Sequence, residues 1–200
     1  MVPVRWCPMS KLAVFFPGIG YTVDKPLLYY SCRIAASYGY EIKRLPYSGF
    51  PQKVRGDKKK MAECFQIALT QAGEMLSETD LSAYDDILFI GKSIGTTVAA
   101  DLAAKSLAVS RIRFVLYTPL EDTLAFPFKN AVVFTGTDDP WVGGSESRIA
   151  ELCRRKNISC FIIPRANHSL ETGNPLADIE TLRYVMDVTE KFIAKQGLPS

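Results

Sequence analysis

The chain has 200 residues, enough for one domain with its own hydrophobic core; 48% of them are apolar and 22% are charged. The 24 basic and 21 acidic residues leave a net charge of +3, which gives no electrostatic reason to expect nucleic acid or a membrane as the main partner. A single histidine, His168, excludes a zinc site built on several histidines, and we expect neither a metal nor a cofactor.

The five cysteines are odd in number and widely spaced, and no C-x-x-C pattern occurs. This favours reduced thiols in a cytoplasmic protein over a disulfide framework. The apolar run 12–17 is far too short to span a membrane, and residues 1–10 lack the pattern of a signal peptide. We therefore expect a cytoplasmic protein without a membrane segment.

In chain order, six short runs rich in apolar, β-branched or aromatic residues predict strands at 12–17, 40–45, 87–90, 112–117, 131–135 and 159–163. Most are apolar throughout, which is typical of strands buried on both faces of a parallel sheet. Helical patterns cover 57–77, 93–107, 145–156 and the segment from 174 to before 197, and a further crossover helix is expected after the first strand. Residues 1–200 therefore predict a single α/β domain with a six-stranded, mostly parallel sheet and helices on both faces.

The third predicted strand runs directly into Gly91-Lys92-Ser93-Ile94-Gly95, and a helix rich in alanine follows. This is the pattern G-x-S-x-G between a strand and a helix. A serine in such a sharp turn projects its hydroxyl out of the sheet. Its neighbours two positions away must be small, because strand and helix would otherwise collide. Gly91 and Gly95 meet that requirement.

At these residues the chain resembles the α/β-hydrolase family of serine hydrolases. The resemblance implies that Ser93 is the nucleophile. The family's acid follows a later strand in a Gly-x-x-Asp-Pro-like turn, which Asp139 matches here, with Asp138 the weaker choice. The family's histidine follows the last strand, where His168 stands. The order Ser93, Asp139, His168 is the chain order of this fold.

The resemblance also implies an oxyanion hole made by the backbone N–H groups of Ile94 and Ile19. Ile19 lies in the loop after the first strand, where the family often has His-Gly-x and this chain has Pro17 before Gly18. If the first crossover helix lies on one face and later helices on the other, the strand order is 2-1-3-4-5-6. The first and third strands are then neighbours, which places residues 18–20 beside Ser93.

Two departures from the family pattern are expected. Only about ten residues precede the first predicted strand, so the family's two leading antiparallel strands should be absent. Residues 118–129, where the family often inserts a lid, are too few to form one. Glu121 and Asp122 lie in this segment and are the alternative acids.

These features predict a serine hydrolase of small carboxylic esters or thioesters with an open site. Its pocket walls would come from residues 19–24, 47–51, 119–126 and 141–142.

One alternative is a binding protein that keeps the fold without catalysis. Another is a nucleotide-binding P-loop ending at Lys92 and Ser93, but its first glycine would have to stand at Asp86. Lys92 is assigned no role, and the basic cluster in residues 53–60 is interpreted as a solvated helix start.

Overall fold

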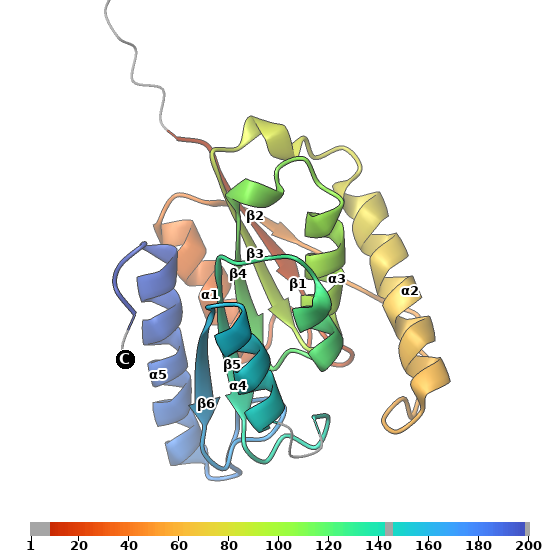
Figure 1. Ribbon diagram of the computed structural model, residues 1–200, viewed down its shortest axis with the longest axis vertical. Coiled ribbons are helices and arrows are strands. Elements are labelled where there is room, and N and C mark those ends of the chain that lie inside the picture. The colour runs from red at the N-terminus through yellow and green to blue at the C-terminus, as the bar shows by residue number, and fades with distance from the viewer. Residues whose placement is uncertain (1–8, 143–145, 199–200) are drawn as a thin grey trace, which may run out of the picture.

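One parallel sheet forms the centre of the protein in a computed structural model that describes residues 9–142 and 146–198 (Figure 1). Its strand order is β2-β1-β3-β4-β5-β6, as the sequence predicts, and every neighbouring pair is parallel. The strands are β1 Lys11–Phe16, β2 Glu41–Arg44, β3 Asp86–Lys92, β4 Ile112–Tyr117, β5 Ala131–Gly136 and β6 Ser159–Ile163. All six predicted strands and the predicted fold class are confirmed.

Five helices of the described segments cover the two faces of this sheet: α1 Pro26–Ser37, α2 Lys58–Leu76, α3 Ile94–Ala104, α4 Glu146–Arg155 and α5 Pro175–Ile193. Prolines in the first turn suit the starts of α1 and α5, and the side chains of Asp57 and Asn174 accept backbone N–H groups at the starts of α2 and α5. The sequence predicts four of these helices near their observed bounds. It gives no bounds for α1, because the exposed Tyr29 and Tyr30 interrupt its apolar pattern.

The helices divide the core into two layers. Helices α2, α3 and α4 pack on one face of the sheet, and α1 and α5 pack on the other. The last helix therefore returns to the face of α1, whereas the sequence prediction placed the later helices on the other face. Because the central strands β3 and β4 are buried along their whole length, the sheet holds the loops at its carboxyl edge in fixed positions.

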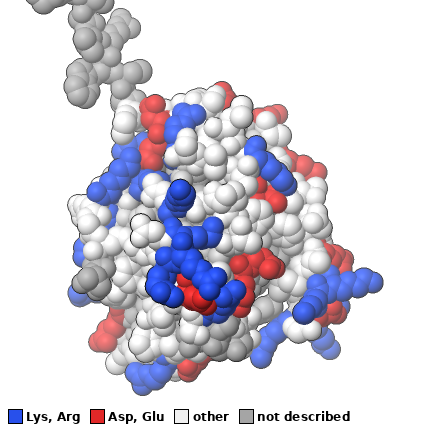
Figure 2. All heavy atoms as spheres, viewed as in Figure 1, with Lys and Arg blue, Asp and Glu red and all other residues white. Residues whose placement is uncertain are grey.

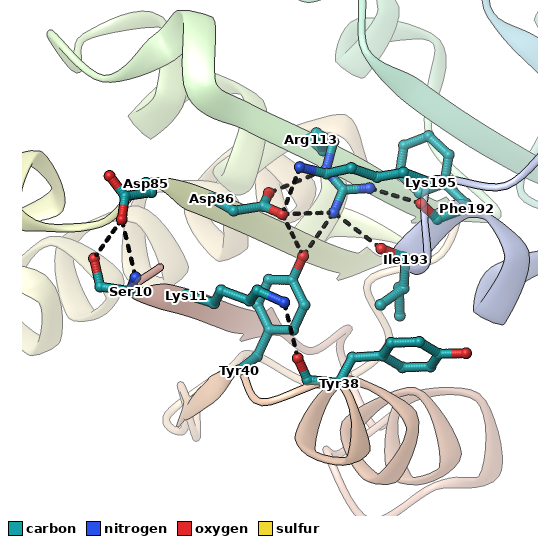
Figure 3. A network of polar contacts seen from close by, with 10 residues as sticks. All are labelled: Ser10, Lys11, Tyr38, Tyr40, Asp85, Asp86, Arg113, Phe192, Ile193 and Lys195. Atoms are coloured by element: carbon teal, nitrogen blue, oxygen red, sulfur yellow. Dashed lines mark hydrogen bonds and ion pairs between the residues drawn. The ribbon is translucent and has the colours of Figure 1, made fainter. Parts of the chain in front are cut away.

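A buried polar network closes the opposite edge of the sheet, where β3 and β4 begin (Figure 3). The Arg113 guanidinium pairs with Asp86 at 3.1 Å and donates to the carbonyls of Phe192 and Ile193 at the end of α5. The Tyr40 hydroxyl donates to the same carboxylate at 2.6 Å. The network therefore ties the last helix to the two central strands.

Basic side chains gather in the middle of the face shown in Figure 2, over α4, with acidic side chains among them. Glu151 pairs there with Arg148 and Arg155. Among the described helices, none is long and apolar enough to cross a membrane. The four cysteines of the described segments are free thiols, whereas Cys7 and most of the segment considered for a signal peptide lie outside them.

Candidate active site

Ser93 stands in the tight turn between β3 and α3. Its backbone has φ 55° and ψ −127°, a conformation that non-glycine residues rarely adopt. The Ser93 N–H donates to the Tyr117 carbonyl at 3.0 Å, which ties the turn to the end of β4. At Gly95 a Cβ would lie 2.2 Å from the Phe16 carbonyl oxygen, so only glycine lets α3 start this close to β1. The steric argument for the motif therefore applies to the folded chain.

The three side chains selected from the sequence meet at the carboxyl edge of the sheet. The Ser93 hydroxyl lies 2.8 Å from His168 Nε2, and His168 Nδ1 lies 2.7 Å from Asp139 Oδ2. Asp139 is 1% exposed, and its other carboxylate oxygen accepts the Trp141 N–H at 2.9 Å. Nδ1–H then donates to the carboxylate, and Nε2 is left to accept the serine proton.

Close packing of two loops brings Asp139 to His168. At Gly136, the last residue of β5, a Cβ would lie 2.1 Å from the Ala166 carbonyl oxygen. The loop after β5 is joined to the loop after β6 by the Asp138 N–H on the Ala166 carbonyl and by the Arg165 N–H on the Thr137 hydroxyl. Gly136 is the signal in the sequence that could have indicated this approach.

The alternative acids do not contact His168. Glu121 and Asp122 lie in the short 3-10 turn η3 Glu121–Ala125, and Glu121 faces Arg148 at 4.0 Å. Asp138 is exposed and accepts the Thr137 hydroxyl. Asp139 is therefore the carboxylate that the fold delivers to the imidazole.

The loop after β1 lies beside the serine, as the strand order predicts. A Cβ at Gly18 would lie 3.1 Å from Ser93 Cβ, and Ile19 packs in a small cluster with Ile94. Within the described parts of the chain, the N–H groups of Ile19 and Ile94 donate to no backbone acceptor. Both N–H groups therefore lack a backbone partner in that part of the chain.

The environment of His168 favours the neutral form of its imidazole. Burial lowers the pKa of His168 below its usual value, the nearby Lys92 lowers it further, and the hydrogen bond with Asp139 opposes both effects. The net shift is downward. A neutral imidazole is the form that can accept a proton from a hydroxyl.

Three further residues hold the site, and none of them was predicted to do so from the sequence. The buried Thr118 has φ 42° and donates its hydroxyl to the His168 carbonyl at 3.1 Å. The Trp141 ring lies 5.5 Å from the His168 ring, centroid to centroid. The Thr123 hydroxyl lies 2.8 Å from the hydroxyls of both Thr96 and Thr97, which fixes η3 to α3.

Two adjoining cavities lie on the side of the site toward α2. One of about 570 Å³ includes Ile94 and Thr97 in its wall, and one of about 540 Å³ includes Trp141 and Val142. They share four wall residues: Lys58, Met61, Leu120 and Asp122. Residues 119–126 and 141–142 contribute as the sequence predicts, whereas residues 19–24 and 47–51 line neither cavity. The wall from α2 was missed, because nothing in a helical pattern shows which loop its first turns will face.

The other chemistries considered find no support in the described residues. Asp86, where a P-loop would need its first glycine, is the buried first residue of β3. The segment from Asp86 to Lys92 is strand, so no loop is available there to surround a phosphate. No cluster of three or more His, Cys, Asp or Glu side chains suited to a metal ion occurs among residues 9–142 and 146–198.

The sheet order, the serine turn and the positions of the acid and histidine loops define an α/β-hydrolase fold. Solved structures with this fold superpose on nearly the whole chain at low sequence identity. Est1E of Butyrivibrio proteoclasticus with bound ferulic acid has a TM-score of 0.66 and 15% identity, covering 97% of this chain and 92% of its own. A serine hydrolase homologue from Coxiella burnetii has a TM-score of 0.61 and 14% identity, covering 89% and 84%.

An esterase from Pyrococcus furiosus has a TM-score of 0.61 and 14% identity, covering 94% of this chain and 84% of its own. No protein-family model matches the sequence, and no curated protein matches it. The likeness therefore establishes the fold, and the chemistry depends on the residues of the site.

Proposed function

We propose that this protein is a serine hydrolase that cleaves small carboxylic esters or thioesters through an acyl-enzyme. The observation that carries the proposal is the continuous series of contacts from Ser93 Oγ to His168 Nε2 at 2.8 Å and from His168 Nδ1 to Asp139 Oδ2 at 2.7 Å. A serine hydroxyl is a weak nucleophile until an adjacent base accepts its proton. This arrangement supplies the base and the group that orients it.

In the first half-reaction, Ser93 Oγ attacks the substrate carbonyl carbon while its proton passes to His168 Nε2. Asp139 stabilises the resulting imidazolium. The negative charge on the former carbonyl oxygen is held by the N–H groups of Ile19 and Ile94. When the tetrahedral intermediate collapses, His168 returns the proton to the departing alcohol or thiol, and the acyl group stays on Ser93.

In the second half-reaction, a water molecule attacks the acyl-enzyme and gives a proton to His168 Nε2. The bond between the acyl carbon and Ser93 Oγ then breaks. The proton returns from His168 to Ser93, and a carboxylic acid leaves. The enzyme is restored without an external oxidant or a cofactor.

The cavities beside Ser93 favour a modest, largely apolar substrate. Met61, Phe65 and Phe126 line the first cavity, with Lys58 and Asp122 as its charged residues. Apolar walls with a few polar groups are typical of small-molecule sites. Two neighbours of the fold support an ester as the substrate: one is an esterase, and the other binds ferulic acid, a carboxylic acid.

Labelling with a fluorophosphonate probe tests the proposal directly. The folded wild-type protein should gain one covalent adduct, located at Ser93 by peptide mass spectrometry. Ser93→Ala should gain none, and Ser106→Ala, at a half-buried serine beyond the end of α3, should label like the wild type.

A panel of nitrophenyl esters and thioesters then identifies the reaction. Turnover that disappears in Ser93→Ala would support the hydrolase. If the folded wild type neither labels nor turns over any ester, the protein is instead a binding protein that keeps the fold.

A further inference from the structure

Lys92 directly precedes the candidate nucleophile in the chain, and its buried side chain has no role in the mechanism above. Lys92 is the last residue of β3 and is 1% exposed. No carboxylate lies within ion-pair distance of its ammonium nitrogen among the described residues. Lysine is almost never fully buried unless it is paired, so this position requires an explanation.

The groups that face Lys92 come from four loops or strands. Its ammonium nitrogen lies 5.0 Å from the centre of the Tyr21 ring, in the loop after β1. Asp139 from the loop after β5 and Glu171 from the loop after β6 attract the charge of Lys92. His168, also in the loop after β6, is close enough for the charge of Lys92 to lower its pKa. Tyr117 lies beside it in β4, with its hydroxyl already bonded to Ser31 and Thr189.

The order in which these groups take up protons follows from their surroundings. Burial lowers the pKa of Lys92 to about 7, and Asp139 and Glu171 oppose that effect. Burial raises the pKa of Tyr21 and Tyr117, so both phenols stay neutral in this range. The pKa of His168 is lowered, so as the pH falls Lys92 becomes charged before His168 does.

We propose that Lys92 is a positioning residue that acts through His168: its buried charge opposes protonation of the imidazole and keeps it available as a base under mildly acidic conditions. The inference rests on the proposed function of the same site. An imidazolium beside an ammonium in a poorly solvated pocket is disfavoured, whereas the neutral imidazole is not. The Tyr21 ring stabilises the ammonium without neutralising it, as the face of an aromatic ring does for a cation.

The single histidine makes the test direct. With labelled histidine, nuclear magnetic resonance reports the pKa of His168 with no overlap from other imidazoles. In Lys92→Met the pKa of His168 should rise relative to the wild type. In Lys92→Arg, which keeps a charge, it should stay low. Lys105→Met removes an exposed lysine at the far end of α3 and should leave it unchanged.

The titration curve of His168 in the wild type provides a second, independent measurement. Its His168 signal should show a minor inflection near pH 7, where Lys92 titrates, above the main transition. A folded Lys92→Met variant whose His168 pKa is unchanged or lower would overturn the proposal. If that variant does not fold, a wild-type titration with no inflection above the main transition would overturn it.

The pH dependence of the fluorophosphonate labelling rate links the effect of Lys92 on His168 to catalysis. The acid limb of the labelling rate should move to higher pH in Lys92→Met and stay in place in Lys105→Met. A wild type that never labels at Ser93 would contradict the proposed function, while the titration would still decide the effect of Lys92 on His168.

Discussion

At the scale of single residues, Ser93 and His168 form one unit because the hydroxyl proton has only one imidazole to go to. We expect Ser93→Ala and His168→Ala each to reduce kcat/KM by about 10⁴-fold or more, and the double variant to be no worse than either single one. Steady-state kinetics on a nitrophenyl ester checks this. Losses that multiply in the double variant would mean that the two residues act independently.

Loss of the Asp139 charge should cost no more than loss of Ser93 or His168. Asp139→Asn keeps the shape of the side chain but removes the charge that fixes the tautomer of His168, and about a 10⁴-fold loss in kcat is expected. Asp122→Asn is the matched control, since Asp122 lines the cavity without contacting the imidazole. A severe loss in the control with a mild loss in Asp139→Asn would assign the acid to η3 instead.

The pH dependence follows from the lowered pKa of His168. Activity needs the neutral imidazole, so it is lost as the pH falls through that pKa. Because burial and Lys92 lower the pKa, the acid limb of kcat/KM should lie below pH 6.5, the usual value for histidine. A limb at or above pH 6.5 in a pH–rate profile would contradict the environment described for His168.

At the scale of elements, strands and the motif could be predicted from sequence, but the cavity wall could not. Apolar runs and the G-x-S-x-G motif are local sequence signals, so the strands and the serine turn can be located without knowing which segments pack together. The contribution of Met61 and Phe65 to the cavities depends on how α2 packs beside α3, which is a tertiary contact. The positions of Thr118 and Thr123 depend on hydrogen bonds between distant segments, which leave no pattern in the chain.

The short segment η3 is fixed rather than free, because the buried Thr123 bonds to two threonines of α3. We therefore expect no jump in rate when a substrate forms an emulsion. We also expect kcat/KM to peak at short acyl chains, roughly two to six carbons. Each methylene that the protein buries contributes about 0.8 kcal/mol of binding free energy, so only a pocket that encloses a long chain would make kcat/KM rise steadily with chain length. A chain-length series of nitrophenyl esters measures both effects.

Ala62→Phe tests which cavity receives the acyl chain. Ala62 lines the cavity of about 570 Å³, so a phenyl ring there should shift the preference toward shorter chains. Glu63→Gln, a change at the next and exposed residue of α2, should not alter it. An unchanged preference in Ala62→Phe would place the acyl group elsewhere.

At the scale of the whole molecule, stability depends on the network opposite the site. Arg113 and Asp86 are both buried, and removing one partner of a buried pair typically costs about 3–5 kcal/mol. Arg113→Met should therefore lower the free energy of unfolding by that order while leaving fluorophosphonate labelling intact below the new Tm. Chemical denaturation measures this, with Arg154→Met on the surface of α4 as control. Equal stabilities in the two variants would show that the network contributes little.

The same network gives stability a pH dependence. Burial opposes ionisation of Asp86, but hydrogen bonds from Arg113, Tyr40 and Lys195 outweigh it and lower the pKa of Asp86. This contribution is fully present above the unfolded-state value of about 3.9 and is lost as the pH falls through the lower folded value. Denaturation series at acidic pH should show a steeper loss of stability in the wild type than in Asp86→Asn.

The position of α5 has a consequence for synthesis of the chain. Residues 175–193 follow all six strands, yet they cover the face of the sheet that α1 begins to cover. While the ribosome is still making this segment, side chains such as Val115 and Phe134 have no complete cover on that face. The nascent protein therefore exposes the part of this face that α1 does not cover until residues 175–193 emerge.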